Sequence, residues 1–273
     1  MKKIGILFLG LISAFSFSQN TRFVYQVSMK TDSTAAPKIE NAYLDISTEK
    51  SIFYGEKRMK RDSTIRQAME TRNFNFDRNS MEQFRTAITY SIEKNHATKT
   101  ISYKDRIARD QYWYDEDRTF NWKILPETVK IGEYETQKAE TTFAGRKWFA
   151  WFTQDLPFID GPYKFSGLPG LIVKVEDEKG DYSFDLKETK KIAELPNFES
   201  RFGNNIKVKR SEFLKQQEKF NKDPMSFFQN QGGGFAMRMG GNQNPQNEAD
   251  RRKRMEERLK EEAKANNNPL EKN

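Results

Sequence analysis

Residues 161–177, GPYKFSGLPGLIVKVED, constrain the fold of this chain more than any other segment. The Gly-Pro pair at 161–162 and the Pro-Gly pair at 169–170 predict tight turns, because proline fixes φ and glycine permits positive φ. The β-branched run at 171–175 that follows is typical of a buried strand. The segment therefore predicts a turn-rich loop that leads the chain into the core of a β-rich domain.

Apolar and polar residues alternate through the first two thirds of the chain, as expected for strands with one buried face. The short, regularly spaced runs predict a mainly β fold: a large antiparallel sheet that is curved, or folded into a sandwich or half-barrel. The chain has no cysteine, so this fold must be stable without disulfides. Strands are expected at 22–30, 42–47, 50–56, 84–94, 98–108, 112–114, 122–125, 134–143, 146–153, 171–177 and 182–188.

The expected strand at 146–153 is unusual because it carries aromatic residues on both faces. Trp148 and Phe152 lie on one face, and Phe149 and Trp151 lie on the other. A strand buried on both sides would have this pattern. We therefore expect the sheet core on one side of it and a helix or loop on the other.

Residues 1–18 have the features of a secretory signal peptide. Lys2 and Lys3 precede an apolar run, and Ser16 and Ser18 place small side chains before the expected cleavage point. The run is shorter than the roughly 20 apolar residues that a membrane-spanning helix needs. We therefore expect no transmembrane anchor after cleavage and a location in the periplasm or outside the cell.

The composition divides the rest of the chain into a β-rich body and a C-terminal part with helical and disordered additions. Ser211 is a candidate helix N-cap, and the charge ladders near the end predict an exposed helix that projects from the body. The expected divisions are the β-rich domain at 19–210, a short helical segment at 211–228, a Gly/Asn/Gln-rich disordered linker at 229–247, a charged helix at 248–265 and a tail at 266–273.

The turn segment also resembles a known family. Its centre, Gly167-Leu168-Pro169-Gly170-Leu171-Ile172, spells the name of the GLPGLI family of secreted bacterial proteins. The resemblance extends over 122–182 and to the ending 267–271, and the shared positions that shape turns or carry charge are Gly145, Arg146, Pro157, Gly161 and Pro162. It implies a β-rich exported domain, and it implies no activity, because the family is functionally uncharacterised.

The resemblance has one departure. Many members of the family carry a cysteine two residues after the tyrosine matched by Tyr134, and this chain has Thr136 there. A disulfide or metal role for that cysteine therefore does not apply to this chain. Members of the family resemble partners of outer-membrane receptor systems, which makes such a receptor or another envelope protein the partner that the resemblance implies.

The positive charge of the chain does not indicate nucleic-acid binding. The formal net charge is +8, and the densest basic runs lie at 57–61 and 251–254. Acidic residues follow both runs closely, a pattern typical of solvated helical faces rather than of phosphate contacts. We expect no nucleic-acid partner.

Few residues offer catalytic chemistry. His96, the only histidine, is expected at an exposed hairpin tip. Arg146, Asp155 and Asp160 form the best polar set, which could act as a carboxylate pair with a tuning arginine on a glycan. The alternative, which we favour, is that Arg146 pairs with one of the two acids and fixes the Gly/Pro loop.

Two binding hypotheses remain. The aromatic residues Trp148, Trp151, Tyr163 and Phe165 are candidates for a concave face that holds an apolar ligand, with ordinary core packing as the favoured explanation. Met237 and Met239 are thioether candidates for Cu(I) in the tail. Apart from that alternative, no metal or cofactor is expected.

Together these observations predict an exported, non-catalytic binding or accessory protein of the cell envelope, with a protein partner or an apolar ligand. The first alternative is an envelope hydrolase that uses Asp155 and Asp160 with Arg146. The second is Cu(I) binding by the methionine-containing tail.

Overall fold

The computed structural model describes residues 20–73, 83–198, 203–229 and 245–272. The expected signal peptide, most of the Gly/Asn/Gln-rich linker, and Met237 and Met239 lie outside these residues. In the described part of the chain no helix combines the length and the apolar character that crossing a bilayer requires.

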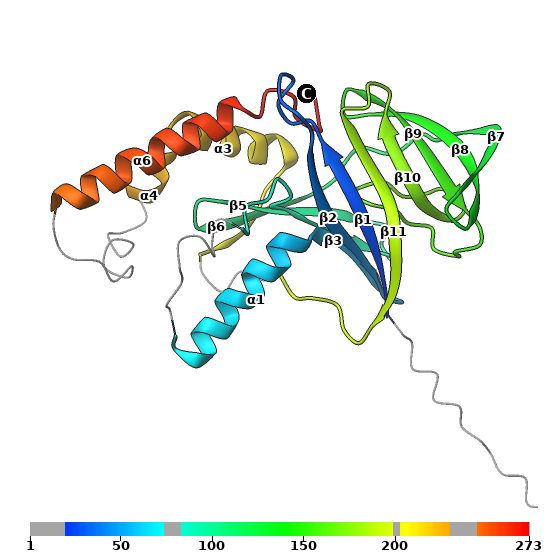
Figure 1. The fold of residues 1–273 in the computed structure, drawn as a ribbon, viewed down its shortest axis with the longest axis horizontal. Helices are drawn as coiled ribbons and strands as arrows, with labels where there is room; N and C mark the ends of the chain where they lie inside the picture. Colours follow the sequence, from blue (N-terminus) through cyan, green and yellow to red (C-terminus); the bar gives the residue numbers. More distant parts are fainter. Residues whose placement is uncertain (1–19, 74–82, 199–202, 230–244, 273) are drawn as a thin grey trace, which may run out of the picture.

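One twelve-stranded sheet forms the body of the protein (Figure 1). Its strands in chain order are β1 (Asn20–Met29), β2 (Lys38–Ile46), β3 (Lys50–Gly55), β4 (Ser91–Asn95), β5 (Ile101–Ile107), β6 (Asp110–Asp115), β7 (Lys123–Ile131), β8 (Tyr134–Phe143), β9 (Arg146–Thr153), β10 (Leu171–Asp177), β11 (Tyr182–Ile192) and β12 (Asn205–Lys207).

Most neighbours in the sheet are also neighbours in sequence. The order is β12-β6-β5-β4-β3-β2-β1-β11-β10-β9-β8-β7, so the pairing of β1 with β11 joins the two halves of the domain. Every pair is antiparallel except β12 with β6, which is parallel. The sheet has two edges, β12 and β7, and is not closed. The mainly β prediction is confirmed, and the short parallel strand makes the sheet mixed.

The core lies on one face of the sheet. Alternate residues of β1, namely Phe23, Tyr25 and Val27, are fully buried, as period-two alternation requires. The loop between β9 and β10 covers this face, and its Phe165 packs edge-on against Trp148 with ring centroids 4.8 Å apart. Burying one such large apolar side chain contributes about 1.5–3 kcal/mol.

The described residues form four helices outside the sheet: α1 (Glu56–Thr71), α3 (Arg210–Lys222), α4 (Pro224–Gln229) and α6 (Pro245–Lys264). α1 contacts β2 and β3, and α3 contacts β5 and β6 (Figure 1). α3 begins one residue before the expected N-cap, with Lys209 in the cap position and no side-chain cap.

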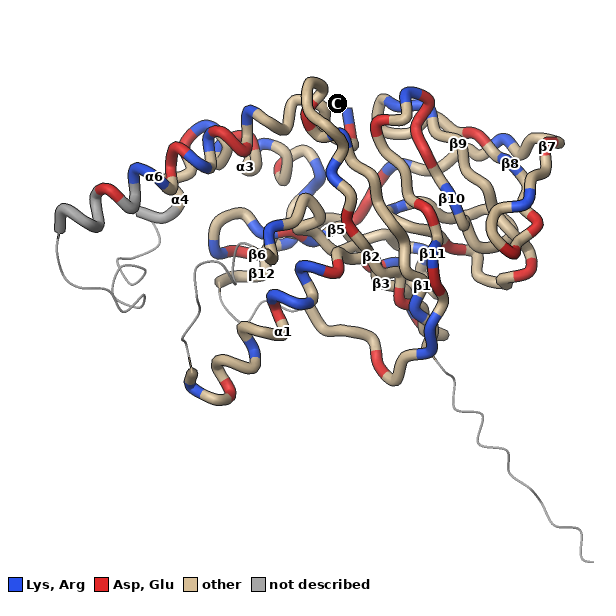
Figure 2. Tube along the Cα trace, in the orientation of Figure 1, with Lys and Arg blue, Asp and Glu red and all other residues tan. Residues whose placement is uncertain are grey.

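The charged helix α6 does not project freely from the body. It contacts α3 and α4, and Figure 2 shows Lys, Arg, Asp and Glu along the part of α6 that is drawn in colour. The segment that follows α6 returns to the sheet and ends beside the β8–β9 turn, where the Lys272 amide donates to the Ala144 carbonyl.

Candidate functional site

The loop between β9 and β10 is held tightly by its glycines. Gly170 has φ +145°, and a Cβ at this position would lie 2.0 Å from the Thr153 carbonyl oxygen. A Cβ at Gly161 would lie 2.8 Å from the Cβ of Ile172. Backbone hydrogen bonds from Gly170 to Leu168 and from Ile172 to Asp160 fix the loop against β10. The local sequence thus produces the expected turns, with no room for other side chains at these two positions.

A buried ion pair joins the loop to β4, which lies in the other half of the sheet. Lys94 Nζ, on β4, donates to Asp160 Oδ1 at 2.5 Å and to the carbonyls of Gly161 and Phe165 at 2.6 and 3.0 Å. Both charged side chains are about 5% exposed. Burial alone would raise the pKa of Asp160, but the Lys94 ammonium and the His96 ring together outweigh it and hold the pKa below its usual range.

His96 lies beside this pair. Its Nε2 is 3.8 Å from Asp160 Oδ2, and its Nδ1 is 3.2 Å from the Thr48 carbonyl. Asp160 raises the pKa of His96 above the ordinary 6.5. The expected hairpin-tip location is observed, but the side chain is only one-third exposed, because it leans toward the Asp160 carboxylate.

The structure does not bring Arg146, Asp155 and Asp160 together. Arg146 Nη1 instead donates to Asp177 Oδ2 at 2.7 Å and to Asp181 Oδ2 at 3.2 Å. The antiparallel register explains this, because Arg146 begins β9 beside the end of β10, whereas Asp155 and Asp160 follow the other end of β9. A strand of this length separates its ends by roughly 23 Å. Asp155 is exposed and Asp160 is buried.

The remaining donors of Arg146 bind the C-terminal segment. Nε donates to the Leu270 carbonyl at 3.0 Å, and Nη2 donates to Asn268 Oδ1 at 2.7 Å and to the Pro269 carbonyl at 2.8 Å. The rigid guanidinium fork suits several acceptors in one plane. Sequence reasoning missed this role, because the bonded residues are more than 120 positions apart along the chain.

A second buried charge cluster receives the end of the same segment. Lys164 Nζ donates to Glu116 Oε2 at 2.6 Å and to Glu271 Oε1 at 2.5 Å, and the Lys164 side chain is fully buried. Arg118 Nη2 donates to Glu271 Oε2 at 2.8 Å. The cluster can neutralise a carboxylate, and it offers no reacting group an open path to solvent, because Lys164 and Glu116 have no exposed side-chain surface.

Of the four aromatic candidates for ligand binding, three lie in the core. Trp148, Tyr163 and Phe165 are at most 3% exposed, and the loop that carries Tyr163 and Phe165 fills the face where an apolar ligand was expected. Trp151 lies on the opposite, outer face of β9. Sequence alternation separated Trp148 from Trp151, but it did not indicate that the chain fills its own concave face.

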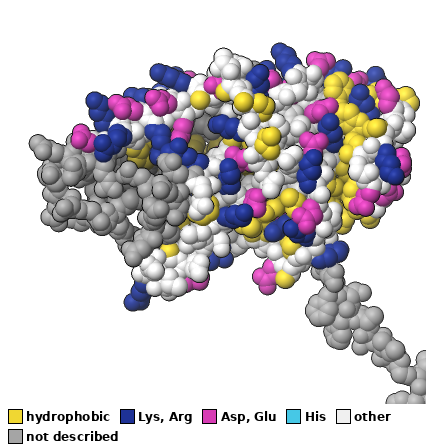
Figure 3. Space-filling model, in the orientation of Figure 1, with side chains coloured by type: hydrophobic (Ala, Val, Ile, Leu, Met, Phe, Trp, Pro, Cys, Tyr) yellow, Lys and Arg dark blue, Asp and Glu magenta, His cyan; other side chains and the backbone are white. Residues whose placement is uncertain are grey.

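The outer face around Trp151 is covered by lysine side chains rather than by the helix or loop expected from the aromatic pattern. Lys174 Nζ lies 5.0 Å from the Trp151 ring centroid. Lys138 Nζ lies 4.6 Å from that of Phe149, and Lys147 Nζ lies 5.1 Å from the same ring. Both rings are half-buried. Figure 3 shows apolar and charged side chains intermixed over the part of the molecule where Figure 1 places β8–β10.

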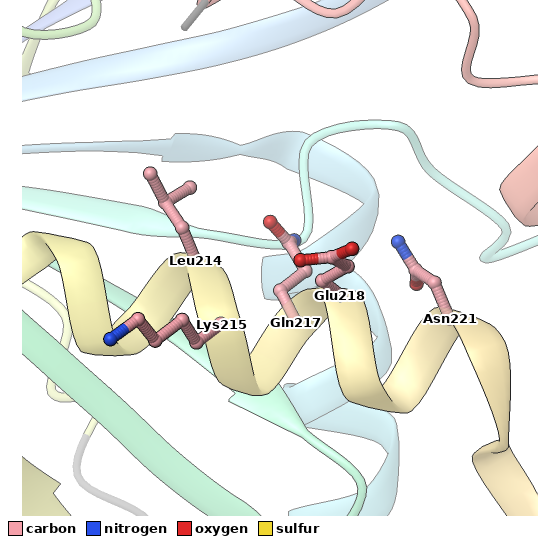
Figure 4. A pocket seen from close by; sticks show the side chains of 5 residues that line it. All are labelled: Leu214, Lys215, Gln217, Glu218 and Asn221. Atoms are coloured by element: carbon pink, nitrogen blue, oxygen red, sulfur yellow. The ribbon is translucent and has the colours of Figure 1, made fainter.

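Other surfaces of the described residues carry little that could bind a small molecule. One open hollow lies on α3, where Leu214, Gln217 and Glu218 are among the lining side chains (Figure 4). A second lies between α3 and α6 and is lined mostly by polar and charged residues, including Lys222 and Lys260. Within the described ranges no group of three or more His, Cys, Asp or Glu side chains is placed to hold a metal ion.

Comparison with protein families gives one match, over residues 141–174, to the family described as "Protein of unknown function (Porph_ging)". The matched stretch spans β9, the Gly/Pro loop and the first half of β10. It supports likeness to an uncharacterised family found in Bacteroidetes, and it does not confirm the GLPGLI resemblance. No curated protein sequence matches the chain.

Solved structures give a similar fold at low sequence identity. Two structures of PNGF-II, in the P21 and C2 space groups, each align with 72% of this chain at a TM-score of 0.53, with 18% and 17% identity. This chain spans about a third of the PNGF-II chains, 33% and 32%. The LolA superfamily protein NE2245 from Nitrosomonas europaea aligns at a TM-score of 0.28 and 10% identity, over 66% of this chain and 88% of that one.

Proposed function

We propose that the protein is an exported, non-catalytic binding or accessory protein of the bacterial cell envelope. We further propose that it engages a protein partner through the outer face of β8–β10. The observation that carries this proposal is the pair of half-buried aromatic rings, Phe149 and Trp151, set among lysines on a face that does not contribute to the core.

Aromatic side chains at the centre of a patch and charged side chains at its rim are the usual arrangement of a protein interface. Trp151 supplies a large ring with a polar N–H group, and the lysine stems around it can move aside when a partner covers the ring. The edge strand β7 adds the exposed Val129, which pairs with Thr136 on the face that also carries Lys138. An outer-membrane receptor is the partner class that the family resemblance implies.

The polar residues that suggested an envelope hydrolase are engaged with other parts of the chain. Asp160 is directed at Lys94, and Arg146 is directed at Asp177 and the C-terminal segment. A carboxylate pair for glycan chemistry requires both groups on one cleft. The geometry therefore favours the binding hypothesis over the hydrolase alternative.

A site-specific crosslinking experiment in intact cells tests the interface. A photo-crosslinking amino acid replaces Lys147, which is exposed next to Phe149, or Lys215, which is exposed on α3 and serves as the matched control. We expect a discrete adduct with an envelope protein from position 147 only, and its loss when Trp151→Ala is added. Equal adducts from both positions, or an adduct that Trp151→Ala leaves unchanged, would refute the outer-face interface.

Export is tested separately by the mass of the protein isolated from the envelope fraction. We expect a polypeptide that begins at Gln19, because the signal peptide is removed on the far side of the inner membrane. A full-length polypeptide retained in the cytoplasm would contradict the envelope assignment without bearing on the interface.

A further inference from the structure

The C-terminal segment, residues 267–272, is held against the sheet in the way that proteins hold a peptide ligand. It has no regular secondary structure, with bends at Asn268, Leu270 and Glu271, and its contacts are made to residues far away in sequence. Backbone hydrogen bonds join its two ends to the sheet: the Asn268 amide donates to Thr31, and the Lys272 amide donates to Ala144, both at 2.8 Å.

The first element of this recognition is the buried side chain of Asn268, which is 7% exposed. Its Nδ2 donates to the Lys30 carbonyl at 2.7 Å, and the backbone carbonyl of Asn268 accepts from the Tyr182 hydroxyl at 2.6 Å. Its Oδ1 accepts from Arg146. An asparagine is needed here, because the site offers one acceptor and one donor to the two ends of the same amide.

The second element is the Arg146 guanidinium, whose side chain is 2% exposed. It binds two successive backbone carbonyls of the segment, those of Pro269 and Leu270, while Asp177 fixes its other side. Contacts to backbone carbonyls hold an extended peptide in place independently of its side chains. Proline suits this position, because its fixed φ restricts the backbone and no backbone N–H is left to satisfy.

The third element is a carboxylate pocket at the far end of the groove. Tyr163 and Lys164 donate to one oxygen of Glu271, and Arg118 and Arg210 donate to the other. With Glu271 removed, Lys164 and Arg118 would keep Glu116 as their carboxylate partner within this cluster, so two cations would share one acid. The pocket therefore selects an acidic side chain at position 271. The preceding side chain, Leu270, packs against the core.

The groove is the surface that holds residues 267–272: the Lys30 carbonyl, Arg146, Tyr182 and the carboxylate pocket. We propose that this groove is a peptide-binding site for the sequence Asn-Pro-Leu-Glu. The chain's own C-terminal segment fills it in cis, and the same segment of a second copy of this chain fills it in trans. The second copy is the occupant argued here because it carries the sequence that the groove matches. None of the residues 267–272 belongs to a strand, so a copy can donate the segment without breaking a strand pair. The inference does not depend on the outer-face interface.

In dilute solution, covalent attachment favours the chain's own C-terminal segment over a free peptide as the occupant of the groove. A ligand attached to its own site has an effective concentration on the order of millimolar. A free peptide at micromolar concentration therefore competes poorly with the wild-type tail. A chain with an impaired tail should bind the peptide readily.

The first test measures binding of a fluorescent peptide with the sequence of residues 265–273 to two full-length proteins. One is the wild type, and the other carries Asn268→Ala and Glu271→Lys, which remove the amide contacts and place a cation against the cationic pocket. We expect at least about tenfold tighter binding to the tail variant. A control peptide with Glu271→Gln should bind that variant at least about tenfold more weakly than the wild-type peptide. A folded tail variant that does not bind, or binds both peptides equally, would overturn the proposal.

A second measurement applies if the tail variant does not fold. A protease site placed between residues 230 and 244 of the wild-type protein allows the chain to be cut after folding. We expect the fragment that begins after the cut to remain bound during gel filtration, and excess peptide of residues 265–273 to release it. Immediate separation, or retention that the peptide cannot reverse, would show that the segment is not held as a ligand.

Exchange between copies is tested with complementary variants. Lys164→Met impairs the groove of one copy and leaves its tail intact, and the tail variant supplies the complementary copy. Each alone should sediment as a monomer, and an equimolar mixture should give a heterodimer. A mixture that stays monomeric, while the free peptide still binds the tail variant, would refute the second copy as the occupant and retain the peptide site.

Discussion

At the scale of single residues, two buried cations of this protein donate hydrogen bonds to backbone carbonyls that lie outside helices and strands. Lys94 holds two carbonyls of the Gly/Pro loop, and Arg146 holds two carbonyls of the C-terminal segment. Leaving such a buried acceptor without a donor costs about 1–3 kcal/mol. These two cations therefore serve to fix irregular segments, and the acids Asp160 and Asp177 neutralise them.

Replacing Gly170 with valine should prevent stable folding. The position has φ +145°, and a Cβ there would lie 2.0 Å from the Thr153 carbonyl oxygen. Backbone strain and the clash together should lower the free energy of unfolding by more than about 3 kcal/mol, as measured by urea denaturation. Gly132→Ala is the matched control: its φ is +60°, but no atom lies within 4 Å of the added Cβ, so a loss of about 1 kcal/mol is expected. Equal losses in the two variants would contradict the close contact at Gly170.

His96 should make stability depend on pH near neutrality. Its pKa in the folded protein is raised above 6.5 by Asp160, so the folded state binds the proton more tightly than the unfolded state. This contribution is complete below pH 6.5 and is lost as the pH rises through the folded pKa. Lys99, Asp160 and the Thr48 carbonyl are the charged and polar groups that act on the ring. We expect the unfolding free energy to fall with rising pH in the wild type and to change less in His96→Gln, both followed by urea denaturation between pH 5.5 and 8.5. Parallel profiles would contradict the prediction.

At the scale of elements, the sequence predicts strands well wherever the alternation is local and the turns carry glycine. The strand at 171–177 has the predicted bounds, and the hairpin turn before β11 contains Gly180 at φ +69°. The short parallel strand β12 was not predicted, because three residues carry no periodicity. Neither was the outer covering of β9, because a lysine stem that packs on an aromatic ring has the same polarity in a sequence as a lysine in solvent.

The helix α3 is joined to the sheet through one aromatic anchor, and its loss should be local. Phe213 is 2% exposed and packs against Tyr103 and Tyr114, with ring centroids 5.5 and 5.3 Å away. Phe213→Ala should cost about 3–5 kcal/mol in this small cluster. Hydrogen exchange should show loss of protection in α3 while β1 and β11 remain protected. Leu214→Ala, a partly buried neighbour, is the control and should leave α3 protected. Global loss of protection in Phe213→Ala would show that the cluster is not a separate unit.

At the scale of the whole molecule, the C-terminal segment joins parts of the sheet that lie far apart in strand order. It contacts the turn after β1, the β8–β9 turn, the Gly/Pro loop and Arg118 after β6. The antiparallel body could be predicted from alternation because each hairpin is a local event. The docking of the tail could not, because neither its irregular conformation nor the position of its partners leaves a periodic pattern. The candidate site was therefore anticipated in its residue types, such as Arg146, and not in its contacts.

The carboxylate pocket should give the protein a distinctive acid response. Burial alone would raise the pKa of Glu271, but Lys164, Tyr163 and Arg118 lower it to about 2 from an ordinary 4.5. A depressed folded pKa contributes stability that is present above pH 4.5 and is lost as the pH falls through about 2. A difference of this size corresponds to about 3 kcal/mol.

Between pH 5 and 2, the unfolding free energy of the wild type should therefore fall by up to about 3 kcal/mol more than that of Glu271→Gln, as measured by urea denaturation. Glu256→Gln, on α6, is the control and should follow the wild type, because its carboxylate pairs with the solvent-exposed Lys260 one turn along the same helix. If Glu271→Gln loses stability on acidification as steeply as the wild type, then the tail carboxylate is not held by the buried cations in solution.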